Sequence, residues 1–225
     1  MAGEENKKIN IDAEELKNQT KDTVKQVKDT IKDVDFKNDT KEATGFVKEM
    51  FNNPFEAVER VAREEENILK KSVVIMIVYI VASVLCQIIY LVKYGSISSV
   101  GSNIMNLVSS VLRPILYVLV PAIIVFIMNK NNKKSLPVVL MTLIAAAVPL
   151  VAVEIIDVLE SIVGAIRLVS SPISTGLASV SAILTYFGMK ELFAEEENGK
   201  FIKTFAIIEV VTALVFYLLS SAGIY

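Results

Sequence analysis

The chain combines a long polar N-terminal region with long apolar segments that are separated by short charged loops. A helix needs roughly 20 apolar residues to cross about 30 Å of hydrocarbon, because each residue advances it by about 1.5 Å. The segments that come closest to this requirement are 72–92, 107–128, 136–153, 173–189 and 204–222. The pattern therefore predicts an all-α fold, a polytopic membrane bundle of five transmembrane helices within residues 72–225.

Weaker periodicities divide the polar region into two parts. Residues 1–45 form a charged arm in which four apolar residues recur at helical spacing, namely Val24, Val27, Ile31 and Val34. Because this stripe is thin and β-branched, an isolated helix would be marginal in water. The arm is predicted to be either a mostly disordered tether or an amphipathic helix bound to a membrane surface or a protein partner.

Residues 46–71 are predicted to form a juxtamembrane amphipathic region. Asn53 and Pro54 are typical of a helix start, because proline suits the first turn, where its missing amide hydrogen is not needed. We expect this helix to lead the chain into the first span.

The distribution of charge separates the same regions. Residues 1–71 hold 14 of the 23 Lys and Arg residues and 17 of the 25 Asp and Glu residues. Ten Lys and Arg residues flank one set of span ends, whereas three flank the opposite set. Because positive residues concentrate in cytosolic loops, this asymmetry predicts a multi-pass protein with a cytosolic N-terminus and an external C-terminus.

The composition also excludes common kinds of chemistry. The chain has no His and a single Cys, Cys86, so it lacks the ligands of a structural zinc and the usual base of Ser and Cys nucleophiles. Neither common glycine-rich phosphate-binding motif occurs. The acidic balance argues against binding to nucleic acid, whose backbone is contacted mainly through Lys and Arg. We therefore expect no enzymatic activity, no catalytic residues, no cofactor, no metal site and no nucleic-acid partner.

Ionisable residues in the membrane half are costly and indicate pairing or function. One set is expected near the outer ends of the second to fourth spans: Arg113, Glu154, Asp157, Glu160 and Arg167. These residues can form a salt-bridged cap or, alternatively, a mouth that attracts cations. Residues 154–169 either extend the third helix or lie along the outer interface.

Glu209 is predicted to lie inside the fifth span, two turns from Lys203. A carboxyl group at that depth needs a hydrogen-bond partner or a proton. Thr142 and Tyr79 are the candidate partners, because we expect them at a similar depth in other spans. The two interpretations are a hydrogen bond between helices and a group that carries protons.

Two further features concern helix packing. Pro114, Pro121 and Pro149 each remove an amide donor and are expected to kink the second and third spans. Small residues recur every four positions in the fourth helix, at Ser170, Ser174, Ala178 and Ala182. This stripe predicts close packing of a helix, either within the bundle or in a homo-oligomer.

The layout of these elements resembles the Yip family, five-span membrane proteins that interact with Ypt/Rab GTPases, in its bacterial branch. The resemblance covers about residues 46–222 and depends on the helix led by Asn53, Pro54 and Phe55, on the proline-centred segment 145–149, and on the short loop from Gly188 to Lys203. It implies a non-enzymatic integral protein, here of the bacterial plasma membrane, that recruits or organises partners.

The sequence thus leads to two functional hypotheses. The first is a membrane scaffold or adaptor, whose partners are the lipid bilayer and an unknown protein bound through the cytosolic arm. The alternative is a small transporter or channel that uses Glu209 and the proline-kinked spans.

Overall fold

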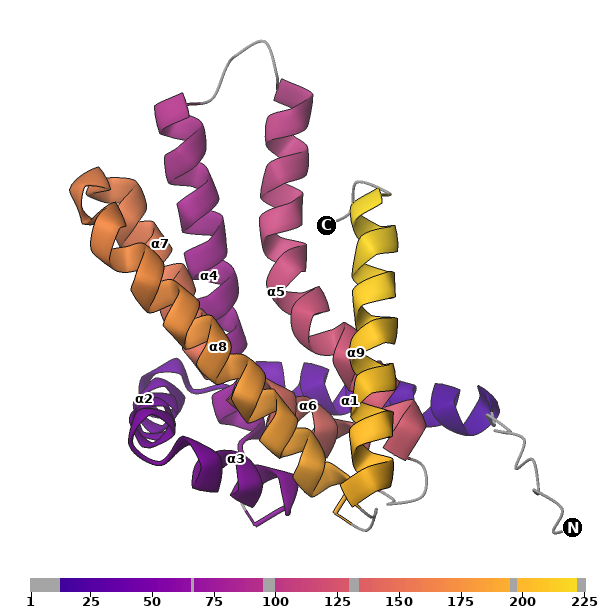
Figure 1. The fold of residues 1–225 in the computed structure, drawn as a ribbon. Coiled ribbons are helices and arrows are strands. Elements are labelled where there is room, and N and C mark those ends of the chain that lie inside the picture. Colours follow the sequence, from indigo (N-terminus) through magenta and orange to yellow (C-terminus); the bar gives the residue numbers. More distant parts are fainter. Residues whose placement is uncertain (1–12, 66, 95–99, 130–133, 195–197, 222–225) are drawn as a thin grey trace, which may run out of the picture.

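A computed structural model describes residues 13–65, 67–94, 100–129, 134–194 and 198–221, and every regular element in these ranges is helical. Four single helices are long and apolar enough to cross a membrane, and a bent pair provides a fifth candidate span. The predicted all-α polytopic bundle is therefore confirmed. These long helices point in a similar direction, while the short N-terminal helices gather at their lower end (Figure 1).

The four single spans are α4 (Leu69–Tyr94), α5 (Val100–Met128), α8 (Arg167–Leu192) and α9 (Asn198–Ser221). Each begins before the apolar segment predicted from sequence, because helical hydrogen bonding continues into the polar residues that flank the hydrocarbon-length core. Pro114 and Pro121 both lie inside α5, which changes direction along its length (Figure 1). The α4 helix packs closely on α7 (Val148–Ile162), which also packs on α8, and α9 packs mainly on α5.

The third span is broken, as its proline predicts. α6 (Leu136–Ala146) and α7 (Val148–Ile162) meet at Ala147 with a bend of 45°, and Pro149 lies in the first turn of α7. The predicted end of this span at residue 153 is too early, because α7 continues to Ile162 before a short 3₁₀ helix, η3 (Gly164–Ile166). Residues 154–162 therefore extend the third helix.

Hydrogen bonds from neighbouring groups compensate for the break. Pro149 has no amide hydrogen, and the Leu150 amide donates to the carbonyl of Ala147 rather than to that of Ala146. The buried Ser181 hydroxyl of α8 donates to the Ala146 carbonyl at 2.8 Å. The oxygen freed by the bend is thus satisfied by a side chain, which is how helices in lipid tolerate proline.

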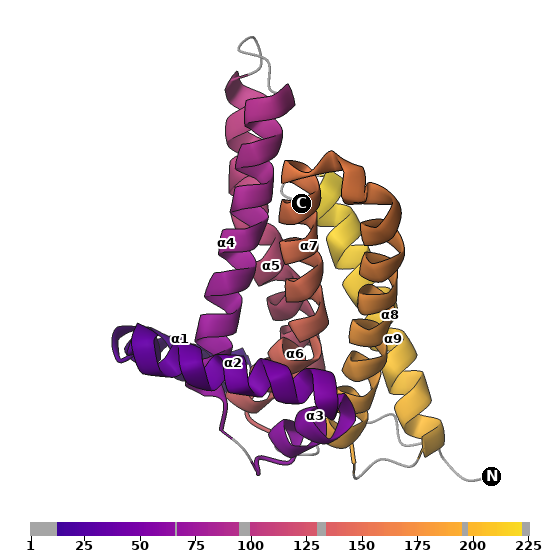
Figure 2. The ribbon, with the colours of Figure 1, turned by 90° about the vertical axis from the view of Figure 1, so that its left-hand side faces the viewer.

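Three helices precede the spans: α1 (Ala13–Lys32), α2 (Phe36–Asn52) and α3 (Pro54–Ala62). α1 and α2 run across the lower end of the long helices (Figures 1 and 2). The start of α3 at Pro54, with Asn53 as its N-terminal cap position, confirms the helix start predicted from sequence. Within the predicted arm, residues 13–32 and 36–45 are helical, in line with the amphipathic-helix alternative, and residues 1–12 lie outside the described residues.

Candidate functional site

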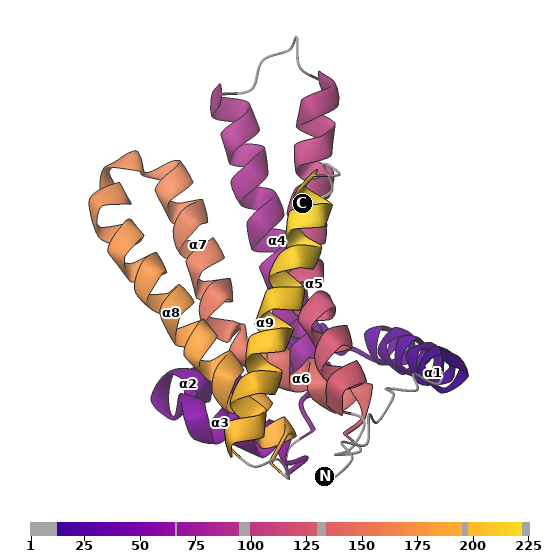
Figure 3. The same cartoon turned by 45° about the vertical axis from the view of Figure 1, so that its right-hand side comes forward.

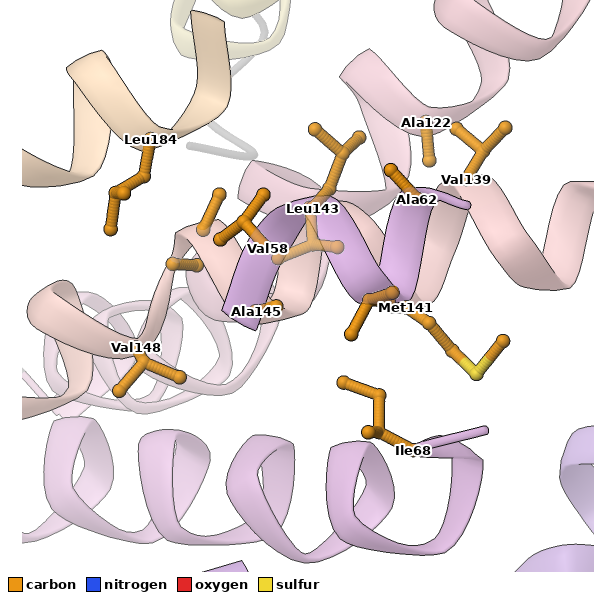
Figure 4. Packing of buried hydrophobic residues seen from close by; sticks show 14 of the residues in the cluster. Val58, Ala62, Ile68, Ala122, Val139, Met141, Leu143, Ala145, Val148 and Leu184 are labelled. Carbon is orange, nitrogen blue, oxygen red and sulfur yellow. The ribbon is translucent and has the colours of Figure 1, made fainter. Parts of the chain in front are cut away.

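The short helix α3 joins the arm to the bundle. One face of α3 is fully buried against α6 and α8, and Figure 4 shows Val58 beside the α6 residues Leu143 and Ala145. The other two buried residues of this helix are Ala57 and Val61. Small and β-branched side chains at this spacing form a narrow apolar stripe, which lets α3 approach both helices closely.

The closest approach occurs at Gly188 of α8. A Cβ atom at this position would lie 2.8 Å from Thr142 Cγ2 and 2.9 Å from Val58 Cγ1. Both distances are below the ordinary carbon–carbon contact of about 3.5–4.0 Å. Gly188 therefore allows α3, α6 and α8 to meet at one point.

Ion pairs surround this apolar contact on the aqueous side. Arg63 at the end of α3 contacts Glu191 of α8 at 2.8 Å, and Lys134 contacts Glu64 at 3.2 Å. Arg60 of α3 pairs with Glu49 of α2. These contacts place the end of α3, the start of α6 and the end of α8 together at one end of the bundle.

The Arg63–Glu191 pair is geometrically specific although it is partly exposed. The pKa of Arg63 is raised above its ordinary value, first by its hydrogen bond to Glu191 and then by the negative charge of the Glu191 carboxylate. Exposed pairs contribute little to stability because solvent screens them. We therefore assign the ion pairs a role in orientation, and the buried face of α3 the main role in attachment.

α2 is fixed by one face and exposed on the other. Ala43, Phe46 and Met50 belong to the core, and the Asp35 side chain caps the helix by accepting from the amides of Lys37 and Asn38. Phe36 and Phe51, near the two ends of α2, have exposed fractions of 61% and 51%. Exposed aromatic side chains on a fixed helix are typical of a binding surface.

α1 packs on α4 and α6, and only part of the apolar stripe predicted from sequence faces the bundle. Thr23 is its most buried side chain, at 6% exposure, whereas Val24 and Ile31 are 61% and 52% exposed. Val27 and Val34 are half-buried. The packed face is thus rotated partly away from the stripe, because its position is set by the surfaces of α4 and α6 and not by apolar spacing alone.

The outer charged residues lie on α5, α7 and the start of α8, and the structure brings some of them together. Glu160 is 3.7 Å from Arg167 and accepts a hydrogen bond from Ser170, while Arg113 acts electrostatically on Glu154. Asp157 is half-buried on the same helix as Glu160. The contacts among Glu160, Arg167 and Ser170 fit the predicted cap at the helix ends.

Lys93 is a further member of this region that the sequence did not single out. Its ammonium group donates to the carbonyl oxygens of Ser161 and Ile162, at the end of α7. A cation at this place offsets the negative end of the helix dipole and satisfies terminal carbonyls. The sequence feature that could have identified Lys93 is its location at the end of a span, opposite the acidic run 154–160.

The predicted polar set of Glu209, Thr142 and Tyr79 is not assembled in this structure. Thr142 is fully buried and donates at 2.8 Å to the Val138 carbonyl of its own helix. Tyr79 is buried on α4, and Glu209 is exposed on α9. The predicted hydrogen bond from Thr142 to Glu209 is therefore wrong, because the hydroxyl satisfies its own helix and α9 packs mainly on α5.

The small-residue stripe of α8 is divided in a similar way. Ser170 is buried and Ser174 is half-buried, whereas Ala178 and Ala182 are exposed. Only the first part of the stripe therefore serves packing inside the chain. Among the described residues, no group of three or more His, Cys, Asp and Glu side chains is placed to hold a metal ion.

Comparisons with known proteins add no relative. No family model, no curated protein and no solved structure matches the chain.

Proposed function

We propose that this protein is a non-enzymatic integral membrane scaffold or adaptor, in which α1 and α2 present a binding surface at the inner face of the membrane. The observation that carries the proposal is the attachment of α3. Its buried face fixes the arm to the bundle, while the outer faces of α1 and α2 remain uncovered. A rigidly held surface loses less conformational entropy when it binds a partner than a flexible tether does.

The surface for a protein partner is centred on Phe36 and Phe51 of α2. Both aromatic rings are exposed, and aromatic side chains supply much of the binding energy in protein interfaces. This role agrees with what the resemblance to the Yip family implies, and we propose membership of that family on the same basis.

The partner surface can be tested by site-specific photocrosslinking in cells. A photoreactive residue at Phe36 and another at Phe51 should capture the same protein. In each crosslinking chain, replacing the other phenylalanine by Asp should reduce capture by about tenfold, as expected for loss of a central aromatic contact of roughly 1.4 kcal/mol or more. Gly45→Asp is the matched control, because Gly45 is exposed on a different side of the same helix and a Cβ there would meet nothing within 4 Å. It should leave capture unchanged. Equal capture by the Phe→Asp and Gly45→Asp variants would exclude this surface as the partner site.

We also propose that the arm lies in the cytosol and that the membrane is the bacterial plasma membrane. Among the positive residues predicted to be cytosolic, Arg60, Arg63 and Lys134 form ion pairs in or beside α3. In a Cys86→Ala background, Tyr94→Cys and Ser221→Cys should react with an impermeant thiol reagent in intact cells. Lys190→Cys, which is also exposed, should react only after the membrane is permeabilised. The reverse labelling pattern would invert the proposed orientation.

The transporter alternative has less geometric support. It uses Glu209 and the proline-kinked second and third spans. α9 packs mainly on the proline-containing α5, but Glu209 is exposed on α9, and Thr142 is bonded within α6. We therefore place the adaptor first.

A further inference from the structure

The lysines of α1 form a continuous charged face. Five of them are exposed, at steps of four, four, three and four residues: Lys17, Lys21, Lys25, Lys28 and Lys32. This is the spacing at which residues lie on one side of a helix. With about 100° per residue, all five fall within an arc of roughly 80°.

The remaining residues of α1 are segregated around this face. Measured from the buried Thr23, the exposed Val24 and Ile31 lie at roughly 80–100° and the lysines at roughly 120–200°. The exposed Asp22 and Asp29 lie at roughly 240–260°, and the exposed Asp33 directly follows the end of the helix. The face of α1 that packs on the bundle is therefore bordered on one side by apolar and basic residues and on the other side by acidic residues.

The position of α1 in the fold suits a membrane surface. α1 packs on α4 and α6 and lies across the lower end of the spans, projecting sideways from the bundle (Figure 3). Its axis thus follows the plane that the bilayer surface would occupy. Helices that bind in this plane carry apolar residues beside lysines and keep their acidic residues toward water.

We propose that α1 binds the anionic headgroup layer of the bilayer that the bundle spans, with Val24 and Ile31 in the acyl boundary and the lysines at lipid phosphates. This deepens the proposed function, because it assigns the membrane as the ligand of one face of the arm and leaves α2 for protein. The two apolar side chains alone would bind weakly, so binding depends on anionic lipid. The spans hold α1 beside the bilayer at high effective concentration, which favours lipid over a soluble acidic protein.

The test uses the full chain in lipid nanodiscs, with Cys86→Ala and an environment-sensitive fluorophore at Val24→Cys. The probe emission should shift to shorter wavelength in discs that contain phosphatidylglycerol, relative to discs of phosphatidylcholine alone. High salt should reverse much of this shift, because screening weakens attraction at the membrane surface. A probe at Asp29→Cys, on the acidic flank, should show no such shift.

A charge exchange tests whether lipid binding depends on the position of the lysines on α1 or only on its net charge. Lys21→Asp with Asp22→Lys, and Lys28→Asp with Asp29→Lys, keep the composition but move two charges to the opposite flank. This variant should lose most of the lipid-dependent shift of the Val24 probe. The control exchanges two adjacent exposed residues of α2, Lys41→Glu with Glu42→Lys, and should retain the shift.

Two outcomes would overturn the inference. The first is a Val24 probe that emits at the same wavelength in neutral and anionic discs. A probe whose emission shifts only after a cell extract supplies an acidic protein would count as the same result, because lipid alone would then have no effect. The second is an exchanged variant that behaves as the parent chain does. Neither outcome affects crosslinking at Phe36 and Phe51, because the nanodiscs contain no protein partner, so failure here is distinguishable from failure of the adaptor proposal.

Discussion

Gly188→Ala is expected to destabilise the protein, although alanine normally stabilises a helix relative to glycine. The added Cβ would meet Thr142 Cγ2 at 2.8 Å and Val58 Cγ1 at 2.9 Å, and all three helices would have to move apart. Overpacking of this kind costs about 1–3 kcal/mol. It outweighs the gain of about 1 kcal/mol or less in helix propensity. Thermal unfolding in detergent should therefore begin at a lower temperature in the variant.

A matched control lies in the same helix. A Cβ at Gly176 would meet nothing within 4 Å, so Gly176→Ala should be neutral or stabilising by up to about 1 kcal/mol. Val58→Ala and Thr142→Ser each remove one of the contacting methyl groups, and combining either with Gly188→Ala should cost less than the sum of the single changes. Simple additivity would show that α3, α6 and α8 do not meet as closely as described.

Attachment of the arm illustrates what the sequence could predict and what it could not. The start of α3 at Pro54 is encoded locally, because the proline and its preceding residue constrain the backbone. The place where α3 docks is not local, since Arg63 and Glu191 are separated by 128 positions. Nothing in a single sequence pairs two such residues.

Periodicity predicted the helices better than their orientation. The apolar residues Val24, Val27 and Ile31 lie in α1, whereas Val34 follows its end at Lys32, and Thr23 is the most buried residue of the helix. A hydrophobic pattern identifies the side of a helix that avoids water, and a membrane surface or a protein core can satisfy it. The choice between them depends on neighbouring elements, which the pattern does not contain.

The same reasoning applies to the third span. Pro149 indicated the break correctly, because a missing amide hydrogen is a local property. The Ser181 hydroxyl that satisfies the Ala146 carbonyl comes from another helix, and many serines in the chain would have been equal candidates. The sequence could therefore predict that the Ala146 carbonyl needs a hydrogen-bond partner, but it could not predict that this partner is Ser181.

Glu209→Leu is expected to strengthen membrane insertion of α9 by about 3 kcal/mol, the difference between a charged and an aliphatic residue near the centre of a transmembrane helix. Glu209 lies in the middle of α9 and is exposed, and it has no hydrogen bond or ion pair with another described residue. Leucine would therefore remove a cost without removing a contact inside the chain. A glycosylation reporter placed after α9 in the full chain should show a larger inserted fraction for Glu209→Leu than for the parent.

Two further variants make this result specific. Ala206→Leu, at another exposed position of α9, should change insertion much less, because alanine is already tolerated in lipid. Glu209→Gln retains hydrogen-bonding capacity but loses the charge, and should give an intermediate inserted fraction.

If Glu209→Leu instead lowers the amount of assembled protein while Glu209→Gln preserves it, the carboxyl must bond to a group outside this chain. If Glu209→Gln assembles normally but abolishes a proton flux measured for the parent in proteoliposomes, the transporter alternative would replace the adaptor proposal.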